Sequence, residues 1–144
     1  RYFIMRIEDI MTTKVQTLSA TDTMQQAAAA MQNHNIGSLP VMGDQGMVGI
    51  VTDRDLVIRG MAAGSDPGTT SVSSLMTGPV VYGTPTMDIN EAADLMSRHQ
   101  IRRLPIIDGG RLVGMVSMAD LARAANYRVT GSTLHDVSEP GTGH

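Results

Sequence analysis

Apolar residues recur along two stretches of the chain at the i, i+3, i+4 and i+7 positions of a helix. These positions are Met24, Ala27, Ala28 and Met31 in the first stretch and Ile89, Ala92, Ala93 and Met96 in the second. Such spacing gives each helix one narrow apolar stripe. Thr23 with Gln26, and Asp88 with Glu91, have the three-residue spacing of a capping box. These two pairs predict where the helices begin.

Strand-like runs surround each of these helices. Short β-prone runs at 15–18 and 80–82 come before them, and two longer runs joined by a glycine-containing turn follow them. The longer runs, each pair predicted to form a hairpin, are 38–42 with 47–52 and 103–107 with 111–117. A second helix is predicted from Thr52 to about Ala63, and from Ser117 to about Tyr127. The order in each stretch is therefore β-α-β-β-α, which predicts a mixed α/β (α+β) fold.

The two stretches are copies of one another at a fixed separation. The matching positions are Met11-Thr12 and Met76-Thr77, His34 and His99, Leu39-Pro40 and Leu104-Pro105, Val48-Gly49 and Val113-Gly114, and Asp55-Leu56 and Asp120-Leu121. Every pair is offset by 65 residues, since 76 − 11 and 121 − 56 both equal 65. A duplicated unit usually folds as two like halves that pack together, and their junction is a natural ligand cleft.

The duplication also predicts how the chain is divided. We expect residues 1–6 to be an N-terminal extension, 7–63 and 75–127 to be the repeated domains, 64–74 a linker, and 128–144 a flexible C-terminal tail. The linker contains glycine and proline, which interrupt a helix. Met5 is expected to be the native start, with Arg1 to Ile4 a cloning remnant.

Composition narrows the classes of function. The 144 residues include 42% hydrophobic and 17% charged residues and no long apolar run, and no export signal is evident, so we expect a soluble, cytoplasmic protein. The absence of cysteine excludes disulfides, thiol catalysis and zinc sites built on thiolates. A net charge of −3 and only 3% aromatic residues disfavour nucleic-acid binding, which relies on basic and stacking side chains.

Two longer motifs appear in both copies. His-x-Ile-x-x-Leu-Pro is followed by Gly-Ile-Val-Thr-Asp-Arg-Asp-Leu in the first copy and by Gly-Met-Val-Ser-Met-Ala-Asp-Leu in the second. Together they resemble a tandem pair of CBS domains, or Bateman module, and the chain is similar to small stand-alone bacterial CBS-pair proteins over about residues 7–127. The resemblance implies two pseudo-two-fold related units packed through their sheets, with adenosine nucleotides bound in the clefts between them. It also implies a homodimeric disc formed through the helices.

A hydroxyl and a carboxylate begin the second helix of each copy, as Thr52-x-x-Asp55 and Ser117-x-x-Asp120. Free N–H groups at a helix N-terminus attract phosphate, and a cap hydroxyl adds a donor. A carboxylate one turn further along can accept hydrogen bonds from the vicinal hydroxyls of a ribose. The spacing therefore suits a nucleotide. The alternative is that both pairs are plain helix caps, each worth about 1 kcal/mol.

The copies differ in charge near these helix starts. Arg54 has Ala119 as its counterpart, so the first copy is expected to suit a charged nucleotide better, unless Arg54 is only an exposed helix charge. Conversely, Arg102 and Arg103 replace a glycine and a serine of the first copy, and they either neutralise phosphate or protect an edge strand. We therefore expect two sites that are not equivalent.

The duplicated histidines stand near the ends of the first helices. A protonated imidazole at His34 or His99 suits the negative end of the helix dipole, and this structural role is favoured. A phosphate contact by His99, beside Arg102 and Arg103, is the alternative. No metal site is expected, because neither histidine has a second ligand at a recognised spacing.

The resemblance places several further residues near the base of a nucleotide. Pro40 and Pro105 suit edge positions of a strand, where they either leave neighbouring backbone groups free to read an adenine edge or only protect the edge. The other candidates are Ile36 and Ile101, which either sandwich the adenine or belong to the core, and Thr17 and Tyr82, near the ends of the first strands. Tyr82-Gly83 replaces Thr17-Leu18 in the second copy, so its base pocket is expected to be altered.

The resulting hypothesis is a non-catalytic sensor of adenosine-type ligands, which include AMP, ADP, ATP, S-adenosylmethionine and NAD(H). No cofactor is expected to be required, and the output would pass through dimer geometry or an effector protein. An enzyme is not expected, because the one triad that could be drawn, Ser117, His99 and Asp120, lacks a nucleophile elbow and has a counterpart in the other copy. A ligand-free interaction scaffold is the alternative, and a single-stranded RNA binder is a distant third.

Overall fold

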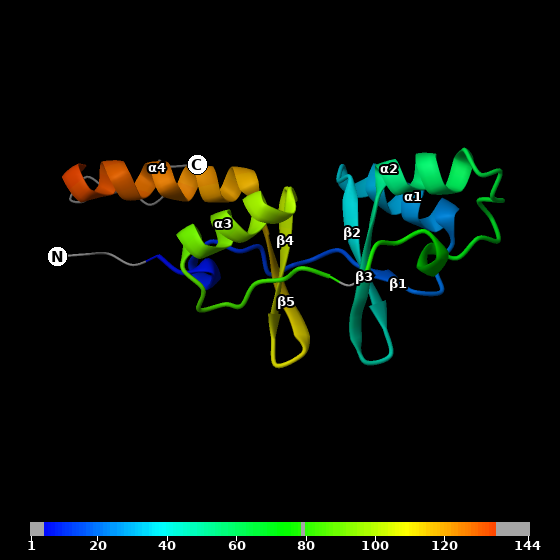
Figure 1. The fold of residues 1–144 in the computed structure, drawn as a ribbon, viewed down its shortest axis with the longest axis horizontal. Coiled ribbons are helices and arrows are strands. Elements are labelled where there is room, and N and C mark those ends of the chain that lie inside the picture. The colour runs from blue at the N-terminus through cyan, green and yellow to red at the C-terminus, as the bar shows by residue number, and fades with distance from the viewer. Residues whose placement is uncertain (1–4, 79, 135–144) are drawn as a thin grey trace. The chain divides into compact units, whose positions relative to one another are not determined.

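The computed structural model describes residues 5–78 and 80–134, with side chains to Asn126, and forms two compact units. One unit consists of Gln16–Val80, and the other joins the residues up to Val15 with those from Val81 onward. We call these the 16–80 unit and the 81–134 unit. Both mix helices and strands, which confirms the predicted α/β class (Figure 1).

The 16–80 unit has a three-stranded sheet in the order β1-β2-β3, with helices packed against it. Its elements are β1 (Leu18–Ser19), α1 (Met24–His34), β2 (Ser38–Gly43), β3 (Gly46–Thr52), α2 (Asp53–Asp55), the π-helical η2 (Leu56–Met61) and the 3-10 helix η3 (Val72–Ser74). In Figure 1 the turn of the β2–β3 hairpin points away from α1 and α2. Leu39, Val41 and Val51 of the hairpin are buried against Ala27 and Met31 of α1, so sheet and helix share one core.

The 81–134 unit repeats this plan with fewer strand pairs. Its elements are the 3-10 helix η1 (Ile7–Asp9), α3 (Ile89–His99), β4 (Arg103–Asp108), β5 (Arg111–Ser117) and α4 (Met118–Leu134). The first strand expected at 80–82 is reduced to one parallel bridge between Gly83 and Ile106. Leu104, Ile106 and Val116 of the hairpin and Met96 of α3 are fully buried and form the core of this unit.

The predicted helix starts are confirmed in both units. The Thr23 hydroxyl accepts the Gln26 N–H at 3.1 Å, and Gln26 Oε1 accepts the Thr23 N–H at 2.8 Å. Asp88 and Glu91 form the same capping box at the start of α3. Each helix ends one residue before a left-handed residue, Asn35 or Gln100, and the chain then turns into the hairpin.

Each unit contains a segment that precedes the other copy in the sequence. Thr77 forms an antiparallel bridge with Ile50 of β3, with N–H···O distances of 2.8 and 3.0 Å. Thr12 pairs with Met115 of β5 in the same way, at 2.9 Å in both directions. The residues before the second copy therefore belong to the first hairpin, and those before the first copy belong to the second hairpin. The domains predicted from the sequence, 7–63 and 75–127, are each contiguous, so they do not describe this exchange of segments.

Pro40 and Pro105 end the parallel pairing of the first strands. Gly83 donates to the Pro105 carbonyl at 2.9 Å, and the Ile107 N–H donates back to Gly83 at 2.9 Å. Extending this ladder toward residue 81 would need an N–H on Pro105, which proline lacks. β1 likewise begins to pair only at Leu18, opposite Val41. The strands therefore begin later than the sequence predicted, and the backbone before them stays outside the ladder.

The expected edge position is wrong for Pro40. It lies on β2, the middle strand of its sheet, and it is fully buried. Pro105 lies on a two-stranded sheet and is also fully buried. Burial against each core, rather than protection of an exposed edge, explains why both prolines are accommodated.

The second helices differ from the expectation at their far ends. α2 passes into the π-helical η2, where the Ala62 N–H bonds the Val57 carbonyl at 2.8 Å. α4 continues to Leu134, beyond the predicted end near Tyr127. Residues 1–4 and 135–144, which include the expected cloning remnant and most of the expected tail, lie outside the described residues. No helix within 5–78 and 80–134 is both long enough and apolar enough to cross a membrane.

Candidate functional site

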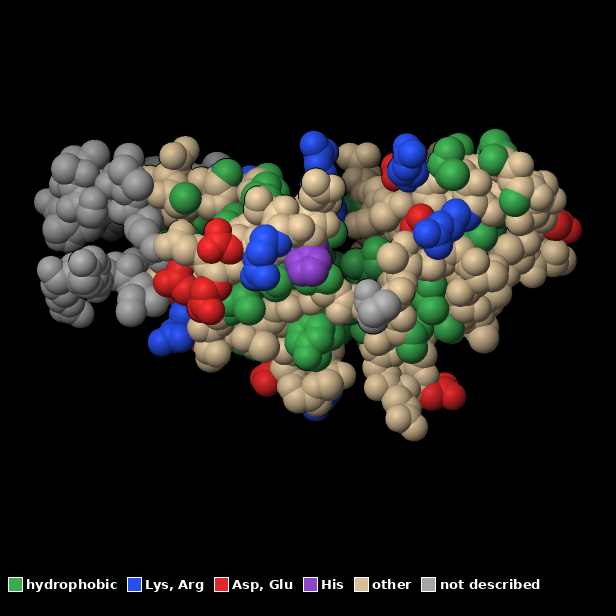
Figure 2. All heavy atoms as spheres, viewed as in Figure 1, with side chains coloured by type: hydrophobic (Ala, Val, Ile, Leu, Met, Phe, Trp, Pro, Cys, Tyr) green, Lys and Arg blue, Asp and Glu red, His purple; other side chains and the backbone are tan. Residues whose placement is uncertain are grey.

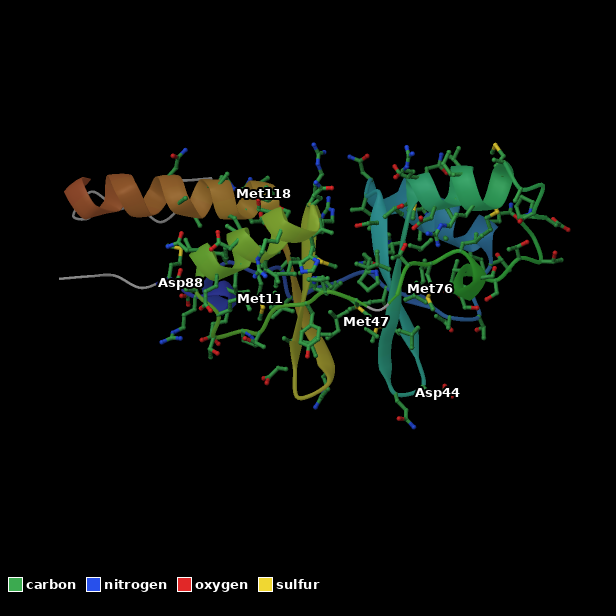
Figure 3. The ribbon with its side chains drawn as sticks, viewed as in Figure 1. Met11, Asp44, Met47, Met76, Asp88 and Met118 are labelled. Atoms are coloured by element: carbon green, nitrogen blue, oxygen red, sulfur yellow. The ribbon has the colours of Figure 1, made fainter. Side chains whose placement is uncertain are left out.

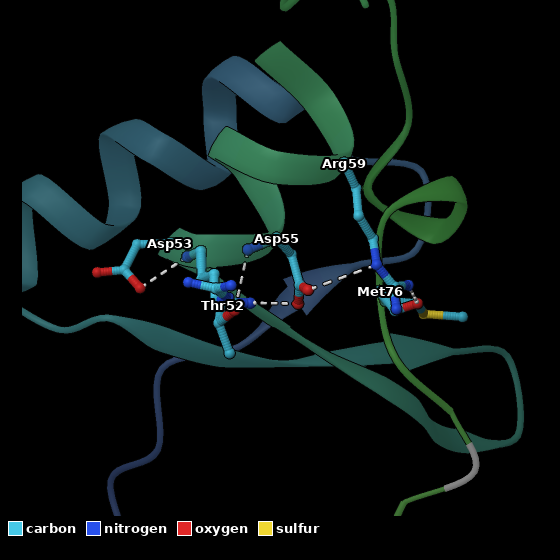
Figure 4. Close-up of polar contacts among 6 residues, drawn as sticks. Thr52, Asp53, Asp55, Arg59 and Met76 are labelled. Carbon is cyan, nitrogen blue, oxygen red and sulfur yellow. Dashed lines mark hydrogen bonds and ion pairs between the residues drawn. The ribbon is translucent and has the colours of Figure 1, made fainter. Parts of the chain in front are cut away.

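The first strand–helix junction is built by Thr52, the last residue of β3, and Asp55, the last residue of α2. The Thr52 hydroxyl accepts the Asp55 N–H at 3.1 Å, and Asp55 Oδ2 accepts the Thr52 N–H at 2.9 Å (Figure 4). This reciprocal capping box fixes both side chains at the helix start. The helix-cap role that the sequence allowed is therefore present, and Asp55 Oδ1 lies outside the cap.

Arg59 contacts that second carboxylate oxygen, and the sequence analysis did not single it out. Its Nε lies 3.8 Å from Asp55 Oδ1, and its Nη1 donates to the Met76 carbonyl at 3.3 Å (Figure 4). The i, i+4 spacing of the two charges is a signal that could have revealed the ion pair. The Met76 contact gave no such signal, because it depends on the exchanged segment. The Arg59 side chain is 53% exposed, so solvent weakens this ion pair.

All three N–H groups of α2 already have partners. The Asp53 N–H donates to the Gly37 carbonyl at 2.9 Å, and the Arg54 N–H donates to Asp53 Oδ1 at 2.8 Å. The Asp55 N–H is taken by the Thr52 cap. A carboxylate therefore already occupies the position where a helix N-terminus would otherwise attract an anion. This weakens the case for phosphate at the first junction, where the sequence analysis based it on Arg54.

The second junction has the same cap. The Ser117 hydroxyl accepts the Asp120 N–H at 3.0 Å, and Asp120 Oδ2 accepts the Ser117 N–H at 3.0 Å. Asp120 Oδ1 pairs with Arg123, three residues further along α4. The Met118 N–H donates to the Arg102 carbonyl at 2.8 Å, which matches the bond from Asp53 to Gly37. The duplicated sequence thus produces a duplicated geometry at this point.

The junctions differ in the residues placed on that shared backbone. Met118 and Ala119 stand where the first copy has Asp53 and Arg54, and neither side chain carries an acceptor for the helix N–H groups. Within the described residues, nothing accepts a hydrogen bond from the Ala119 N–H. Arg103 pairs with Ser117 across the hairpin, and both Arg102 and Arg103 are exposed beside the helix start.

Ser38 is a second junction residue that the sequence analysis missed. It lies opposite Thr52 in the β2–β3 hairpin, at the position that corresponds to Arg103. Its Oγ is buried and has no hydrogen-bond partner within the described residues. A buried hydroxyl is normally satisfied by protein, water or ligand, so the Ser38 hydroxyl keeps an unused donor beside the junction. Nothing in the sequence around Ser38 indicates this role.

Thr17 and Tyr82 occupy equivalent places at the open ends of the first strands. Each directly precedes the first residue that pairs in parallel, Leu18 or Gly83. Both are exposed, and within the described residues neither has a backbone hydrogen-bond partner. The prolines keep this backbone unpaired, as described above. The backbone at these positions is therefore free to contact a ligand, and the base-reading role that the resemblance implies stays a prediction.

The remaining candidates are two isoleucines and two histidines. Ile36 and Ile101 are partly buried and pack against the cores of the two units, as the core alternative predicted. His34 and His99 are the last residues of α1 and α3 and are exposed, as the helix-end alternative predicted. Within the described residues, no group of three or more His, Cys, Asp and Glu is placed to hold a metal ion.

The duplicated junction is matched by a known protein family. A family profile for the CBS domain matches the chain twice, over residues 7–60 and 72–127. The chain belongs to the CBS-domain family. Both matches include a junction described above, and they cover most of the chain.

Relatives of similar length show the same pairing of domains. The chain is 44% identical to the CBS domain-containing protein YhcV of Bacillus subtilis, over 92% of this chain and 94% of that protein. The crystal structure of Hypoxic Response Protein I with two coordinated zinc ions is 41% identical, covers 83% of this chain and 98% of that one, and gives a TM-score of 0.77. The CBS domain pair of protein MJ0100 in complex with 5′-methylthioadenosine and S-adenosyl-L-methionine is 26% identical, with coverage of 85% and 97% and a TM-score of 0.75.

These matches span nearly the full length of relatives that are themselves of similar size to this chain. The chain spans nearly the whole of YhcV and nearly the whole of the Hypoxic Response Protein I structure. CBS-pair proteins are regulatory modules, and those that stand alone are generally regulatory rather than catalytic.

Proposed function

We propose that this CBS pair is a non-catalytic sensor that binds adenosine-type ligands at its strand–helix junctions and requires no cofactor. The observation that carries the proposal is the duplicated hydroxyl–carboxylate pair, Thr52 with Asp55 and Ser117 with Asp120, held in the same geometry in both units. A related CBS pair, that of MJ0100, is known in complex with two adenosyl compounds.

The junction carboxylates retain the capacity to bind a ribose. Each Oδ2 accepts one backbone N–H, and each Oδ1 faces an arginine, but a carboxylate offers about four acceptor positions in total. Asp55 and Asp120 are partly buried, with 14% and 22% of their side-chain surface exposed. Partial burial strengthens a charge-assisted hydrogen bond to a ligand hydroxyl while leaving room for the ligand to reach it.

The same sensor is proposed to be a cytoplasmic homodimer whose geometry, or an effector protein bound to it, carries the output. Val57, Ile58 and Met61 of η2 are 50%, 52% and 67% exposed. Val57 and Met61 line an apolar groove of about 610 Å³, together with residues of α1 and with Leu56 and Pro67. Large apolar side chains that gather on one helix face mark an interaction surface. This observation also supports the second candidate function, a scaffold that dimerises without binding a ligand.

A third function, binding of single-stranded RNA, finds little support. Figure 2 shows side chains of both charges interspersed over the visible face of the molecule, without a continuous basic area. Backbone-tracking grooves for single strands are positively charged and lined with stacking aromatic residues. A steep decrease of oligonucleotide affinity with salt would be needed to support it.

A ligand panel separates the sensor from the scaffold. Thermal shift and calorimetry with AMP, ADP, ATP, S-adenosylmethionine and NAD(H) should identify at least one compound that raises the free energy of unfolding. The increase is about 2.7 kcal/mol when the ligand is present at 100 times its dissociation constant. Asp55→Ala with Asp120→Ala should abolish the effect, whereas Asp44→Ala in the exposed hairpin turn should not. If no compound stabilises the wild type, the scaffold is the better description.

A further inference from the structure

The two junctions share a backbone geometry but differ at four equivalent positions. Gly37, Ser38, Asp53 and Arg54 in the 16–80 unit correspond to Arg102, Arg103, Met118 and Ala119 in the 81–134 unit. The equivalence is structural as well as sequential. Ser38 and Arg103 both pair with the cap residue, and the carbonyls of Gly37 and Arg102 both accept the first helical N–H. Any difference in ligand preference should therefore arise from these side chains and from the arginine that pairs with each junction carboxylate, Arg59 or Arg123.

Charge separates the two junctions. Around the first helix start, the carboxylates of Asp53 and Asp55 cancel the guanidiniums of Arg54 and Arg59. Around the second, Arg123 pairs with the single carboxylate of Asp120, and Arg102 and Arg103 lie beside the helix start through their backbone pairing with Met118 and Ser117, which gives a net charge of +2. Both arginines beside the cap are exposed and therefore accessible to a ligand.

Hydrogen-bonding capacity changes in the same direction. At the first junction Asp53 Oδ1 takes the Arg54 N–H, so the helix start is filled by a carboxylate of the chain itself. A phosphate there would meet a like charge and no free helix N–H. A Cβ on Gly37 would lie 3.1 Å from Asp53 Oδ2, so any longer side chain there would have to displace this carboxylate. At the second junction Met118 and Ala119 present no carboxylate, and the Ala119 N–H remains available to an anion.

The first junction instead offers a neutral donor. The buried Ser38 Oγ has no hydrogen-bond partner within the described residues and lies opposite the Thr52 cap. A hydroxyl donor beside a carboxylate suits an uncharged acceptor or a cationic group, because the carboxylate repels an anion and attracts a cation. The first copy is therefore built for an adenosine compound without phosphate.

We propose that the two junctions select ligands by charge: the second junction binds a phosphorylated adenosine nucleotide through Arg102, Arg103 and the start of α4, whereas the first excludes phosphate and accepts an uncharged or cationic adenosine derivative. This proposal rests on the proposed function, since it assigns ligand classes to the two sites of that sensor. It reverses the preference suggested by Arg54 alone.

Calorimetry with AMP and with 5′-methylthioadenosine tests the assignment, because both carry adenosine but only AMP carries a charge. Asp120→Asn should remove AMP binding and leave 5′-methylthioadenosine binding, and Asp55→Asn should do the opposite. Arg103→Ser should weaken AMP about tenfold or more, the usual effect of losing a charge-assisted hydrogen bond. Asp53→Asn should allow AMP to bind at the first junction while retaining an acceptor for the Arg54 N–H.

Matched controls exclude effects of charge alone. Asp44 lies in the β2–β3 turn, away from the junction (Figure 3), and Arg111 lies at the start of β5, on the turn side of its hairpin. Asp44→Asn and Arg111→Ser should change neither affinity by more than about twofold, because exposed distant charges are screened. AMP affinity should decrease with added NaCl, whereas 5′-methylthioadenosine affinity should not. Circular dichroism and thermal melting establish that each variant is folded.

The outcomes distinguish charge selection from the proposed sensor function on which it rests. If neither ligand binds the wild type at any concentration tested, charge selection is overturned, and the wider ligand panel then decides whether the sensor itself stands. If both ligands bind but each is lost equally in Asp55→Asn and Asp120→Asn, the sensor stands and charge selection is wrong. Unchanged AMP affinity in folded Arg103→Ser likewise overturns the role of that arginine.

Discussion

The Met76 side chain packs directly on Gly49, at the place where any other residue would carry its β-carbon. A Cβ at position 49 would lie 2.5 Å from the Met76 sulfur and 2.9 Å from the Thr77 carbonyl oxygen. Gly49→Ala should therefore force the exchanged segment away from β3 and lower the free energy of unfolding by about 1–3 kcal/mol, the usual cost of overpacking. Chemical denaturation followed by circular dichroism measures this change.

The second copy provides an internal repeat of the test. A Cβ on Gly114 would lie 2.5 Å from the Met11 sulfur, so Gly114→Ala should show a loss of similar size. Gly68→Ala is the matched control, because its nearest neighbour would be a flexible Asp66 oxygen at 3.7 Å. If Gly49→Ala lowers the free energy of unfolding no more than Gly68→Ala does, the exchanged segment moves aside without strain.

The contact between Met76 and Gly49 also shows which features can be predicted from the sequence and which cannot. The sequence shows that a Met-Thr pair and a Val-Gly pair recur in both copies, the apolar spacing and capping boxes located α1 and α3, and the β-prone runs with their glycine turns located both hairpins. The offset between the copies has a limit. It could not show that Met76 packs on the glycine of the first copy and Met11 on that of the second. The same set of contacts could be made within each copy or by exchange, because both copies present the same residues. Only the three-dimensional structure distinguishes the two.

The candidate site was predictable to a similar extent. The hydroxyl–carboxylate pairs were evident because a capping box has a defined spacing. The role of Asp53 was not, since its carboxylate bonds the N–H of the next residue and this leaves no periodic signal. Ser38 escaped notice for a comparable reason: an unpartnered hydroxyl is defined by what surrounds it. The sequence therefore shows the charge of Arg54 but not that the Asp53 carboxylate accepts the Arg54 N–H at the helix start.

Removing either cap hydroxyl should weaken its helix start. Thr52→Ala and Ser117→Ala each leave one helical N–H without its side-chain acceptor, at a cost of about 1 kcal/mol of unfolding free energy. Urea denaturation without ligand measures the cap alone. The Thr52→Ser and Ser117→Thr variants keep the hydroxyl and should lie within about 0.5 kcal/mol of the wild type. Equal losses in the Ala and hydroxyl-retaining variants would show that the caps contribute nothing.

The left-handed residue after α3 is a site of removable strain. Gln100 has a φ of +54°, a conformation that glycine adopts without cost and most other residues avoid. Gln100→Gly should raise the free energy of unfolding by about 0.5–1 kcal/mol, after the higher entropy of the unfolded glycine chain is included. Asn35, with a φ of +53°, is the equivalent residue after α1, and asparagine tolerates this conformation better. Asn35→Gly should therefore stabilise less, and a larger gain at position 35 would contradict this explanation.

The proposed dimer face belongs to one copy of the repeat. Val57 of η2 is half exposed beside Ile58 and Met61, whereas the equivalent positions of α4 carry Ala122, Arg123 and Asn126. A charge placed in an apolar interface must be desolvated without a partner, which is strongly unfavourable. Val57→Glu should therefore convert a dimer to a monomer in sedimentation velocity measurements, while the matched variant Ala122→Glu, which is also exposed, should leave the dimer intact.

A wild type that sediments as a monomer at all concentrations would remove the dimer from the proposed mechanism, and the output would then depend on an effector protein alone. A dimer lost only in Ala122→Glu would place the interface on α4 instead, where charge rather than apolar area would have to hold the two chains together.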